Sequence, residues 1–196
     1  MITDTKISIT EDGGIVVAGV CGVGGLRLVG DGGTTTIGNG GIVIAGDGGF
    51  ATAGDGGFAT VGDKGRAIVG DDGIAVAGDG SEVTVGYSGT ATAGHGGVAV
   101  AGDYGFAKVG DCGVATAGDN GIAVAGGRGT STVGEGGLAI VGIDGTASAG
   151  KASRIVIKYW CYDDAAYKTV IGLVGSDGIL PYVLYRAHEG VLTRFN

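Results

Sequence analysis

Glycine recurs at every eighth position of this 196-residue chain, without a gap from Gly22 to Gly150. A second glycine series lies three residues after the first, from Gly25 to Gly145, and is broken only at Ser81. The repeating unit is therefore an octad, (Ala/Val)-Gly-Asp-x-Gly-x-Ala-x, as in residues 53–60. A fixed period of this kind indicates a repeat architecture in which each unit packs on its neighbours. Collagen is excluded, because it needs glycine at every third position and abundant proline, and this chain has 1 proline.

Four residues of each octad alternate in size, which predicts a β-strand with an inner and an outer face. Alanine and valine share one face, whereas the other face carries Arg66, Glu82 and Lys108, so the Ala/Val face is the inner one. We expect the Gly-Asp-x-Gly segment to form a tight corner, in which the repeated glycines supply positive φ and Asp makes an Asx hydrogen bond. Strand and corner together predict an all-β, Gly-rich β-solenoid. The small inner side chains favour a coil of two octads over a three-sided coil of three octads.

Composition divides the chain into an irregular N-terminal coil or cap (1–25), the octapeptide-repeat β-solenoid (26–150) and a C-terminal aromatic β module (151–196). Residues 1–150 hold 44 of the 48 glycines, with 16 acidic and 6 basic side chains, whereas the module holds 4 acidic and 6 basic ones. An open solenoid end exposes unpaired strands, so we expect the module to act as a cap. Its predicted strands are 155–162, 167–174, 180–185 and 191–195.

The sequence shows no catalytic or metal-binding motif. Cys21, Cys112 and Cys161 form no C-x-x-C pair, which argues against a zinc site or a disulfide framework. His95 and His188 are isolated, and no glycine-rich segment precedes a predicted helix as a phosphate-binding loop requires. We therefore expect a protein that is not an enzyme and that uses no cofactor and no metal ion.

Membrane insertion and secretion are not indicated by the sequence. No apolar stretch approaches the roughly 20 residues that a membrane-spanning helix needs. Met1–Thr10 lacks a basic start followed by an apolar run, so no secretory signal is expected.

Residues 85–92, Val-Gly-Tyr-Ser-Gly-Thr-Ala-Thr, resemble the octad Ala-Gly-Tyr-Gly-Ser-Thr-x-Thr of bacterial ice-nucleation proteins. That resemblance covers most of residues 26–150 and implies a solenoid of two octads per coil. The chain is also similar to uncharacterised phage and prophage proteins that combine "TATAG" repeats with a short aromatic module, here beginning at Ile155. This second resemblance implies a phage protein located in the bacterial cytoplasm or in the virion, where it could be a fibre or spike component. It brings no activity.

Ice binding of the ice-nucleation type requires Thr-x-Thr pairs that stack on one flat face. Apolar pairs separate the outward Thr-x-Thr pairs of this chain, which we interpret as scattered, so ice binding is disfavoured. The pairs are Thr34/Thr36, Thr90/Thr92 and Thr130/Thr132, with Thr146/Ser148 as a partial fourth.

Outward apolar side chains fall on one face of a two-octad coil. They are either scattered exposed residues without a role or a continuous strip, and a continuous strip is typical of an association surface. We predict that this face binds protein, and that the chain forms a homo-oligomer, most simply a two-fold dimer. The candidate oligomer face consists of Ile42, Ile44, Phe58, Ile74, Val76, Phe106, Ile122, Val124, Leu138 and Ile140.

Aspartate occupies the corner of nine octads, and a two-sided coil sorts these residues into two acidic edge columns. The first interpretation is structural, with Asx hydrogen bonds and solubility as the role of the aspartates; calcium binding is disfavoured because each corner offers one carboxylate. The alternative function is mimicry of nucleic acid, in which the columns occupy a basic groove of a host or defence protein. Direct nucleic-acid binding is not expected at a net charge of −8. The candidate residues are Asp47, Asp55, Asp63, Asp71, Asp79, Asp103, Asp111 and Asp119, after a first corner at Asp31.

The C-terminal module carries aromatic and cationic side chains of the types that dominate protein-binding hot spots. Tyr159, Trp160, Tyr162 and Arg186 are the candidate binding residues there. From the sequence we thus expect a non-enzymatic β-solenoid that presents a rigid surface to a protein partner.

Overall fold

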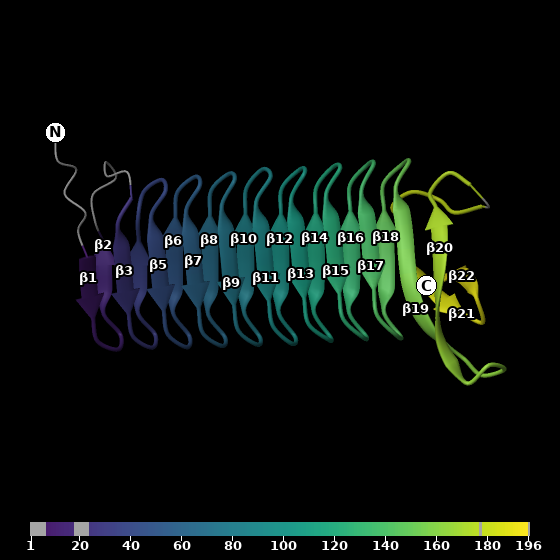
Figure 1. Cartoon of the computed structure of the whole chain (residues 1–196), viewed down its shortest axis with the longest axis horizontal. Coiled ribbons are helices and arrows are strands. Elements are labelled where there is room, and N and C mark those ends of the chain that lie inside the picture. Colours follow the sequence, from purple (N-terminus) through teal and green to yellow (C-terminus); the bar gives the residue numbers. More distant parts are fainter. Residues whose placement is uncertain (1–6, 18–23, 177, 196) are drawn as a thin grey trace.

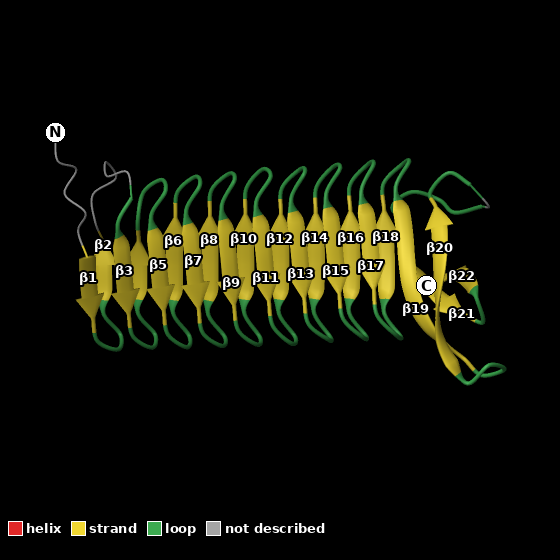
Figure 2. Cartoon of the chain, viewed as in Figure 1, coloured by secondary structure: helices red, strands yellow, loops and turns green. Residues whose placement is uncertain are grey.

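The computed structural model describes residues 7–17, 24–176 and 178–195, and these consist of strands and turns without a helix. Figure 1 shows a rod of stacked coils with a small module at its C-terminal end. Two eleven-stranded sheets run along the rod, one with the odd-numbered strands up to β19 followed by β20, and one with the even-numbered strands up to β18 followed by β21 and β22. Turns join the sheets along the two long edges (Figure 2). The predicted all-β solenoid is confirmed.

The first sheet is called sheet A and the second sheet B. Sheet A contains β1 (Ile7–Thr10), β3 (Leu26–Val29), β5 (Ile42–Ala45), β7 (Phe58–Val61), β9 (Ile74–Ala77), β11 (Thr90–Ala93), β13 (Phe106–Val109), β15 (Ile122–Ala125), β17 (Leu138–Val141), β19 (Arg154–Cys161) and β20 (Ala166–Leu173). Sheet B contains β2 (Ile15–Val17), β4 (Thr34–Thr36), β6 (Phe50–Ala53), β8 (Arg66–Val69), β10 (Glu82–Val85), β12 (Val98–Ala101), β14 (Val114–Ala117), β16 (Thr130–Val133), β18 (Thr146–Ala149), β21 (Tyr185–His188) and β22 (Val191–Arg194).

Each coil of the rod uses two octads. Ile42 pairs with Phe58, and Phe58 pairs with Ile74, so parallel partners lie two octads apart in the sequence. This register confirms the two-octad coil and excludes the coil of three octads. In the first coil Ile7 pairs with Leu26, so the expected imperfect N-terminal coil is longer than the others by three residues.

The core of the solenoid is a thin double layer of alanine and valine. Ala51 in sheet B and Ala59 in sheet A, for example, are both fully buried. Because such small side chains bury little apolar surface, the hydrogen bonds between coils must contribute much of the stability of the rod. Arg27 is an exception to this Ala/Val core. Its side chain occupies an inner position of β3 and is buried, which the repeat pattern does not reveal.

Apart from Gly25 (φ 129°), the described glycines of the two repeated series do not supply the positive φ at the corners, contrary to the expectation from sequence. Positive φ belongs to the variable residue between them, which is Gly56 in one corner, Lys64 in the next and Tyr104 further along, with φ between 55° and 61°. Side chains are tolerated there because this residue points into solvent.

Close backbone packing explains the repeated glycines instead. A Cβ atom on Gly57 would lie 2.7 Å from the Cβ of Ala53 and 2.8 Å from the carbonyl oxygen of Gly54. On Gly54, a Cβ would lie 2.7 Å from the backbone nitrogen of Asn39 in the preceding coil. The glycines are therefore required by contacts within the corner and between coils, not by backbone conformation.

Serine replaces the second glycine of the corner at two places, Ser81 and Ser153. The buried Oγ of Ser81 accepts a hydrogen bond from the amide of Gly65 (3.1 Å) and donates one to the carbonyl of Gly62 (3.0 Å). Ser153 makes the same pair of bonds with Gly137 and Gly134, at 3.0 and 2.8 Å. The break in the glycine series at Ser81 is thus filled by a side chain that bonds the preceding coil.

Two hairpins close the C-terminal end of the rod. β19 continues sheet A in parallel with β17 and pairs with β20, while β21 pairs with β18 and with β22. Ile155, Ile157 and Tyr185 extend the buried core into this module, which therefore covers the end of the solenoid. The expected third strand at 180–185 is wrong, because this segment is a turn and loop; Tyr182 has φ 60° and the strand begins only at Tyr185.

Candidate functional site

The outer face of sheet A carries two columns of apolar side chains. The first and third residues of each strand point outward, as the burial pattern of β5 shows, and the register places equivalent residues of successive coils side by side. All of the predicted oligomer-face residues lie in these columns. The first column holds Leu26, Ile42, Phe58, Ile74, Thr90, Phe106, Ile122 and Leu138, and the second holds Leu28, Ile44, Thr60, Val76, Thr92, Lys108, Val124 and Ile140.

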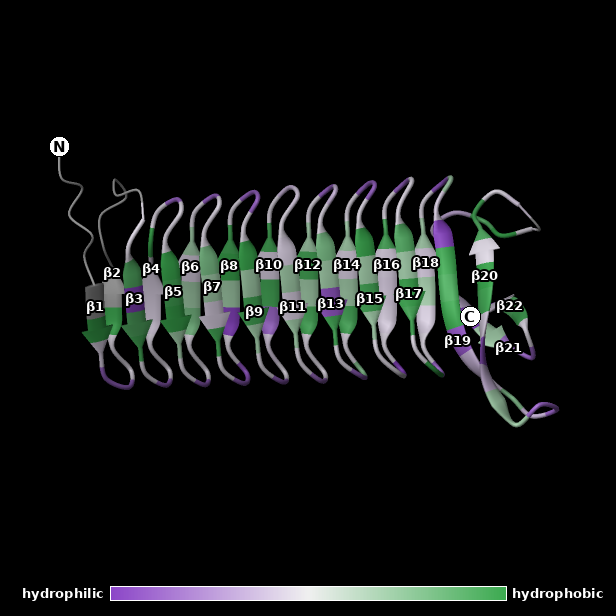
Figure 3. Cartoon of the chain, viewed as in Figure 1, coloured by the Kyte–Doolittle hydropathy of each residue, from purple (hydrophilic) through white to green (hydrophobic). Residues whose placement is uncertain are grey.

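The two faces of the rod differ sharply. Of the 16 outward positions on β3–β17 in sheet A, 12 are apolar and one is charged, Lys108. Of the 16 outward positions on β4–β18 in sheet B, 5 are apolar, and Arg66 and Glu82 form an ion pair at 3.4 Å. Figure 3 shows that the hydrophilic residues of the rod gather mainly at the turns along both edges. The outward apolar residues therefore gather on one face, which we call the sheet A face, and the pair Thr90/Thr92 on β11 interrupts them.

The sheet A face extends onto the C-terminal module. Val156 of β19 lies opposite Ile171 of β20, which is 68% exposed, and Leu173 lies opposite Arg154. Beyond them Trp160 packs edge-on against Tyr167, with 4.8 Å between ring centroids, and Lys158 lies over the ring of Tyr167.

The threonine pairs are less scattered than the sequence analysis concluded. Thr130/Thr132 of β16 and Thr146/Ser148 of β18 are neighbours in sheet B, and the hydroxyls of Thr130 and Thr146 lie 3.1 Å apart. Thr34/Thr36 belongs to the same sheet but lies at its other end, and Thr90/Thr92 belongs to sheet A. Linear spacing missed the stacking because equivalent positions recur only in every second octad.

The aspartates form the two edge columns that the sequence predicted. Asp31, Asp47, Asp63, Asp79 and Asp111 follow strands of sheet A, and His95 interrupts them. The other edge follows sheet B and contains Asp55, Asp71, Asp103 and Asp119, with Tyr87 as the interruption. Tyr87 lies beside Tyr104 on this edge, at 5.4 Å between ring centroids.

The hydrogen bonds of the aspartates run between coils and are not Asx turns. The Oδ1 atom of Asp63 accepts a bond from the backbone amide of Asp79 at 2.8 Å, and Asn39 bonds the amide of Asp55 in the same way at 3.0 Å. Each column is thus a ladder in which a side chain satisfies the corner amide of the next coil. Each ladder misses one rung, at His95 and at Tyr87, because in the described residues no side chain accepts from the amides of Asp111 and Asp103. Both ladders resume in the next coil, where Asp111 accepts from the amide of Gly127 and Asp103 from that of Asp119.

The four predicted binding residues of the module do not converge. Trp160 lies on the sheet A face, while Tyr159 points to the inner side, where its hydroxyl approaches Gly190. Tyr162 is 83% exposed just after β19, and Arg186 lies over the ring of Phe195 on the β21–β22 hairpin. Trp160 instead forms a cluster with Tyr167 and Lys158, which alternation along the two paired strands could have indicated.

Electrostatic effects in the module arise from two local contacts. Hydrogen bonds from Lys168 and then Cys161 hold the pKa of Asp164 below its ordinary value, and the same contact with Asp164 raises the pKa of Lys168. Desolvation, followed by the negative charges of Glu135 and Asp119, raises the pKa of Tyr182. Asp119 and Glu135 are the last two acidic residues along the edge that follows sheet B.

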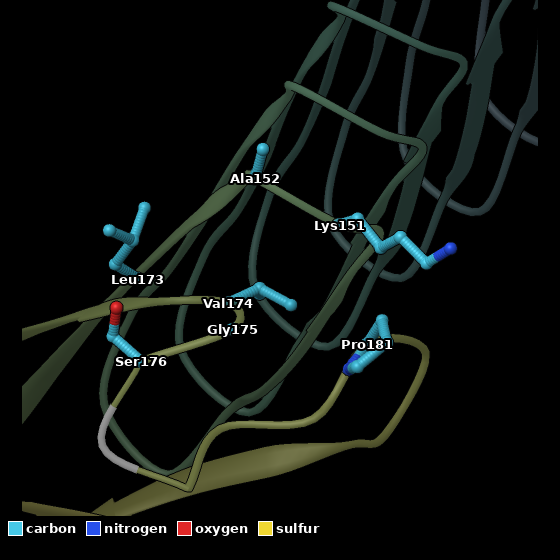
Figure 4. A pocket seen from close by; sticks show the side chains of 7 residues that line it. All are labelled: Lys151, Ala152, Leu173, Val174, Gly175, Ser176 and Pro181. Atoms are coloured by element: carbon cyan, nitrogen blue, oxygen red, sulfur yellow. The ribbon is translucent and has the colours of Figure 1, made fainter.

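A pocket of about 440 Å³ lies between the last solenoid corner and the module. Lys151 is the one charged residue among those that line it, and its ammonium group points away from the other lining residues (Figure 4). The remaining lining residues are Ala152, Leu173, Val174, Gly175, Ser176 and Pro181. The pocket therefore brings no pair of titratable groups together.

Nowhere in residues 7–17, 24–176 and 178–195 do three His, Cys, Asp or Glu side chains converge as potential metal ligands. Across the same residues there is no helix with the length and apolar character needed to cross a membrane.

Comparison with known protein families, curated proteins and solved structures finds no match for this chain. The fold and its surfaces define a β-solenoid protein with one apolar face, and the similarity to ice-nucleation and phage repeats remains a resemblance of pattern.

Proposed function

We propose that this protein is a non-enzymatic, rigid β-solenoid scaffold that acts by protein association through the sheet A face, in the first place with a second copy of itself. The observation that carries the proposal is the pair of apolar columns along β3–β17, on a chain whose 20 acidic residues leave this face free of negative charge. Removing such a strip from water is favourable in proportion to its apolar area.

The size of the sheet A face suits a dimer. Strand spacing and rise give roughly 500 Å² for β3–β17 and roughly 250 Å² for the outer face of β19–β20. A stable protein–protein interface typically buries about 800 Å² per partner. A second copy is favoured over an unrelated partner because its coils repeat at the same spacing, so side chains that mesh at one coil mesh at all of them.

Charge insertion on the face tests the proposal. Ile74→Glu with Ile122→Glu places two carboxylates in the first column, at positions that are 43% and 37% exposed. Val98→Glu with Val114→Glu is the matched control on sheet B, at 37% and 40% exposure.

In sedimentation velocity the parent protein is expected at twice 18.8 kDa, the sheet A variant at 18.8 kDa and the sheet B control at the parent value. A parent protein that stays monomeric at high concentration contradicts the proposal, as does equal dissociation of both variants.

A second candidate function rests on the acidic ladders. Two straight columns of carboxylates, spaced by about 4.8 Å per coil, could occupy a basic groove that normally holds phosphates. Asn39 already serves as a ladder acceptor, so Asp47→Asn, Asp63→Asn and Asp79→Asn remove charge and keep the hydrogen bonds.

The triple asparagine variant gives a clean test of mimicry. Competition with duplex DNA for a basic DNA-binding protein should be lost in this variant and should weaken steeply with salt. Competition that is unchanged by the substitutions and by salt rules mimicry out.

A further inference from the structure

The sheet A face is apolar except at a few outward positions, and these restrict how two copies can pack. On β3–β17 the exceptions are Thr60, the pair Thr90/Thr92 on β11, and Lys108 on β13. Lys108 is preceded on the same face by Phe106, so one coil carries an aromatic ring in the first column and an ammonium group in the second. A buried lysine without a suitable partner is costly, which makes its surroundings decisive.

Two dimers with an in-plane two-fold axis bury the whole face. In the parallel arrangement the axis runs along the rod, so each coil meets the same coil of the second copy, and the first column lies over the second column. In the antiparallel arrangement the axis runs across the rod, so each column meets the same column of the second copy, and the order of the coils is reversed about β11.

In the parallel arrangement, each of the polar and charged outward residues of β3–β17 faces a suitable partner, apart from Thr60. Lys108 lies over Phe106 of the second copy, where an ammonium group is attracted to the ring face. Thr90 lies opposite Thr92 of the second copy, where the hydroxyls can exchange hydrogen bonds. The apolar pairs of the other coils, such as Ile42 and Ile44, meet each other in the same way.

The antiparallel arrangement with full overlap leaves Lys108 poorly placed. Lys108 then lies over Val76 of the second copy, where it contacts neither an aromatic ring nor an acceptor on the facing surface. Arg154 does not separate the two arrangements, because it lies over Leu26 in this one and over Val156 in the parallel one. We infer that two copies of this protein pack through their sheet A faces as a parallel, in-register dimer, with Lys108 of each copy over Phe106 of the other. This inference rests on the proposed self-association.

Distances between spin labels separate the two arrangements. In a cysteine-free background (Cys21→Ser, Cys112→Ser, Cys161→Ser), a label at Thr36→Cys sits on the outer face of sheet B, away from the interface. In a parallel dimer the two labels are about 30 Å apart, three sheet spacings of about 10 Å each. In the antiparallel dimer they are also offset by seven coils of about 4.8 Å, which gives roughly 45 Å. A label at Thr84→Cys, near the middle of the rod, should give about 30 Å in both cases and serves as the control.

Mixed disulfide formation is the second measurement. A Phe106→Cys chain and a Lys108→Cys chain, each in the cysteine-free background, should cross-link when mixed and much less when each is oxidised alone. A Thr36 label distance at the longer, antiparallel value, or cross-linking of Lys108→Cys with itself, overturns the parallel register and leaves self-association standing. A monomeric mass with no measurable dipolar coupling overturns both.

Discussion

The Oδ1 atom of Asp47 accepts a hydrogen bond of 2.9 Å from the backbone amide of Asp63, one coil further along the chain. The carbonyl of Asp63 in turn accepts a bond of 2.8 Å from the amide of Gly48, next to Asp47. Where Asp or Asn stands in the corner, successive coils are therefore joined by a side-chain bond and a backbone bond. The aspartates along the edges thus also bond successive coils to each other, which explains why so many like charges recur in one column.

Restoring the interrupted ladder should stabilise the rod. His95→Asn places an acceptor in the corner position that Asn39 occupies on the opposite edge, so it should bond the amide of Asp111 and raise the free energy of unfolding by about 1 kcal/mol. Chemical denaturation measures the change. His95→Ala is the control, since it removes the imidazole without adding an acceptor, and equal stabilities of the two variants would refute the role of the ladder.

Two adjacent glycines should respond very differently to alanine. Gly56 has φ 61° and open space around it, so Gly56→Ala should cost about 1 kcal/mol through backbone conformation alone. Gly57→Ala drives a methyl group into Ala53 and the Gly54 carbonyl, and should cost about 3 kcal/mol by overpacking. Thermal denaturation of the two variants checks the order, and the reverse order would contradict close packing as the reason for the repeated glycines.

Residues with side chains at the positive-φ position are sites for stabilisation. Ala152 has φ 56°, and Ala152→Gly should raise the free energy of unfolding by about 1 kcal/mol by relieving left-handed strain. Ala147 is a buried strand residue, and Ala147→Gly should destabilise by a similar amount. If both substitutions shift the denaturation midpoint in the same direction, the assignment of strain to Ala152 is wrong.

The tip of the β19–β20 hairpin should be held by its ion pair only over a limited pH range. The pKa of Asp164 is lowered from 3.8, so its contribution is complete above that value and is lost as the pH falls through the lowered pKa. The pKa of Lys168 is raised from 10.5, so its contribution is complete below that value and is lost as the pH rises through the raised pKa. Lys168→Met should return the pKa of Asp164 toward 3.8 in a carboxyl NMR titration, and Lys158→Met should leave it unchanged. If Lys168→Met leaves the pKa of Asp164 where it is in the parent protein, the contact does not form in solution.

Sequence reasoning was most accurate where the pattern is local. The alternation within residues such as 58–61 predicted the strands, and small inner side chains predicted the two-octad coil. The same reasoning misplaced the third strand of the module, because Leu180–Leu184 is apolar enough for a strand but holds Tyr182 in a left-handed turn. It also grouped Trp160 with Arg186. The two residues lie on different surfaces, because Trp160 belongs to the β19–β20 hairpin and Arg186 to the β21–β22 hairpin.

By itself the sequence determined the solenoid, since a period of two within a period of eight leaves strand and corner as the consistent solution. It also determined which side chains point outward and that aspartate lines the edges. Only the tertiary structure decided what these residues contact. The partner of each aspartate, the atoms that exclude a side chain from Gly57, and the gathering of apolar residues on the sheet A face all depend on a neighbour one coil away or across the corner. Such contacts are set by the stacking of coils, which brings together residues that the linear sequence keeps two octads apart.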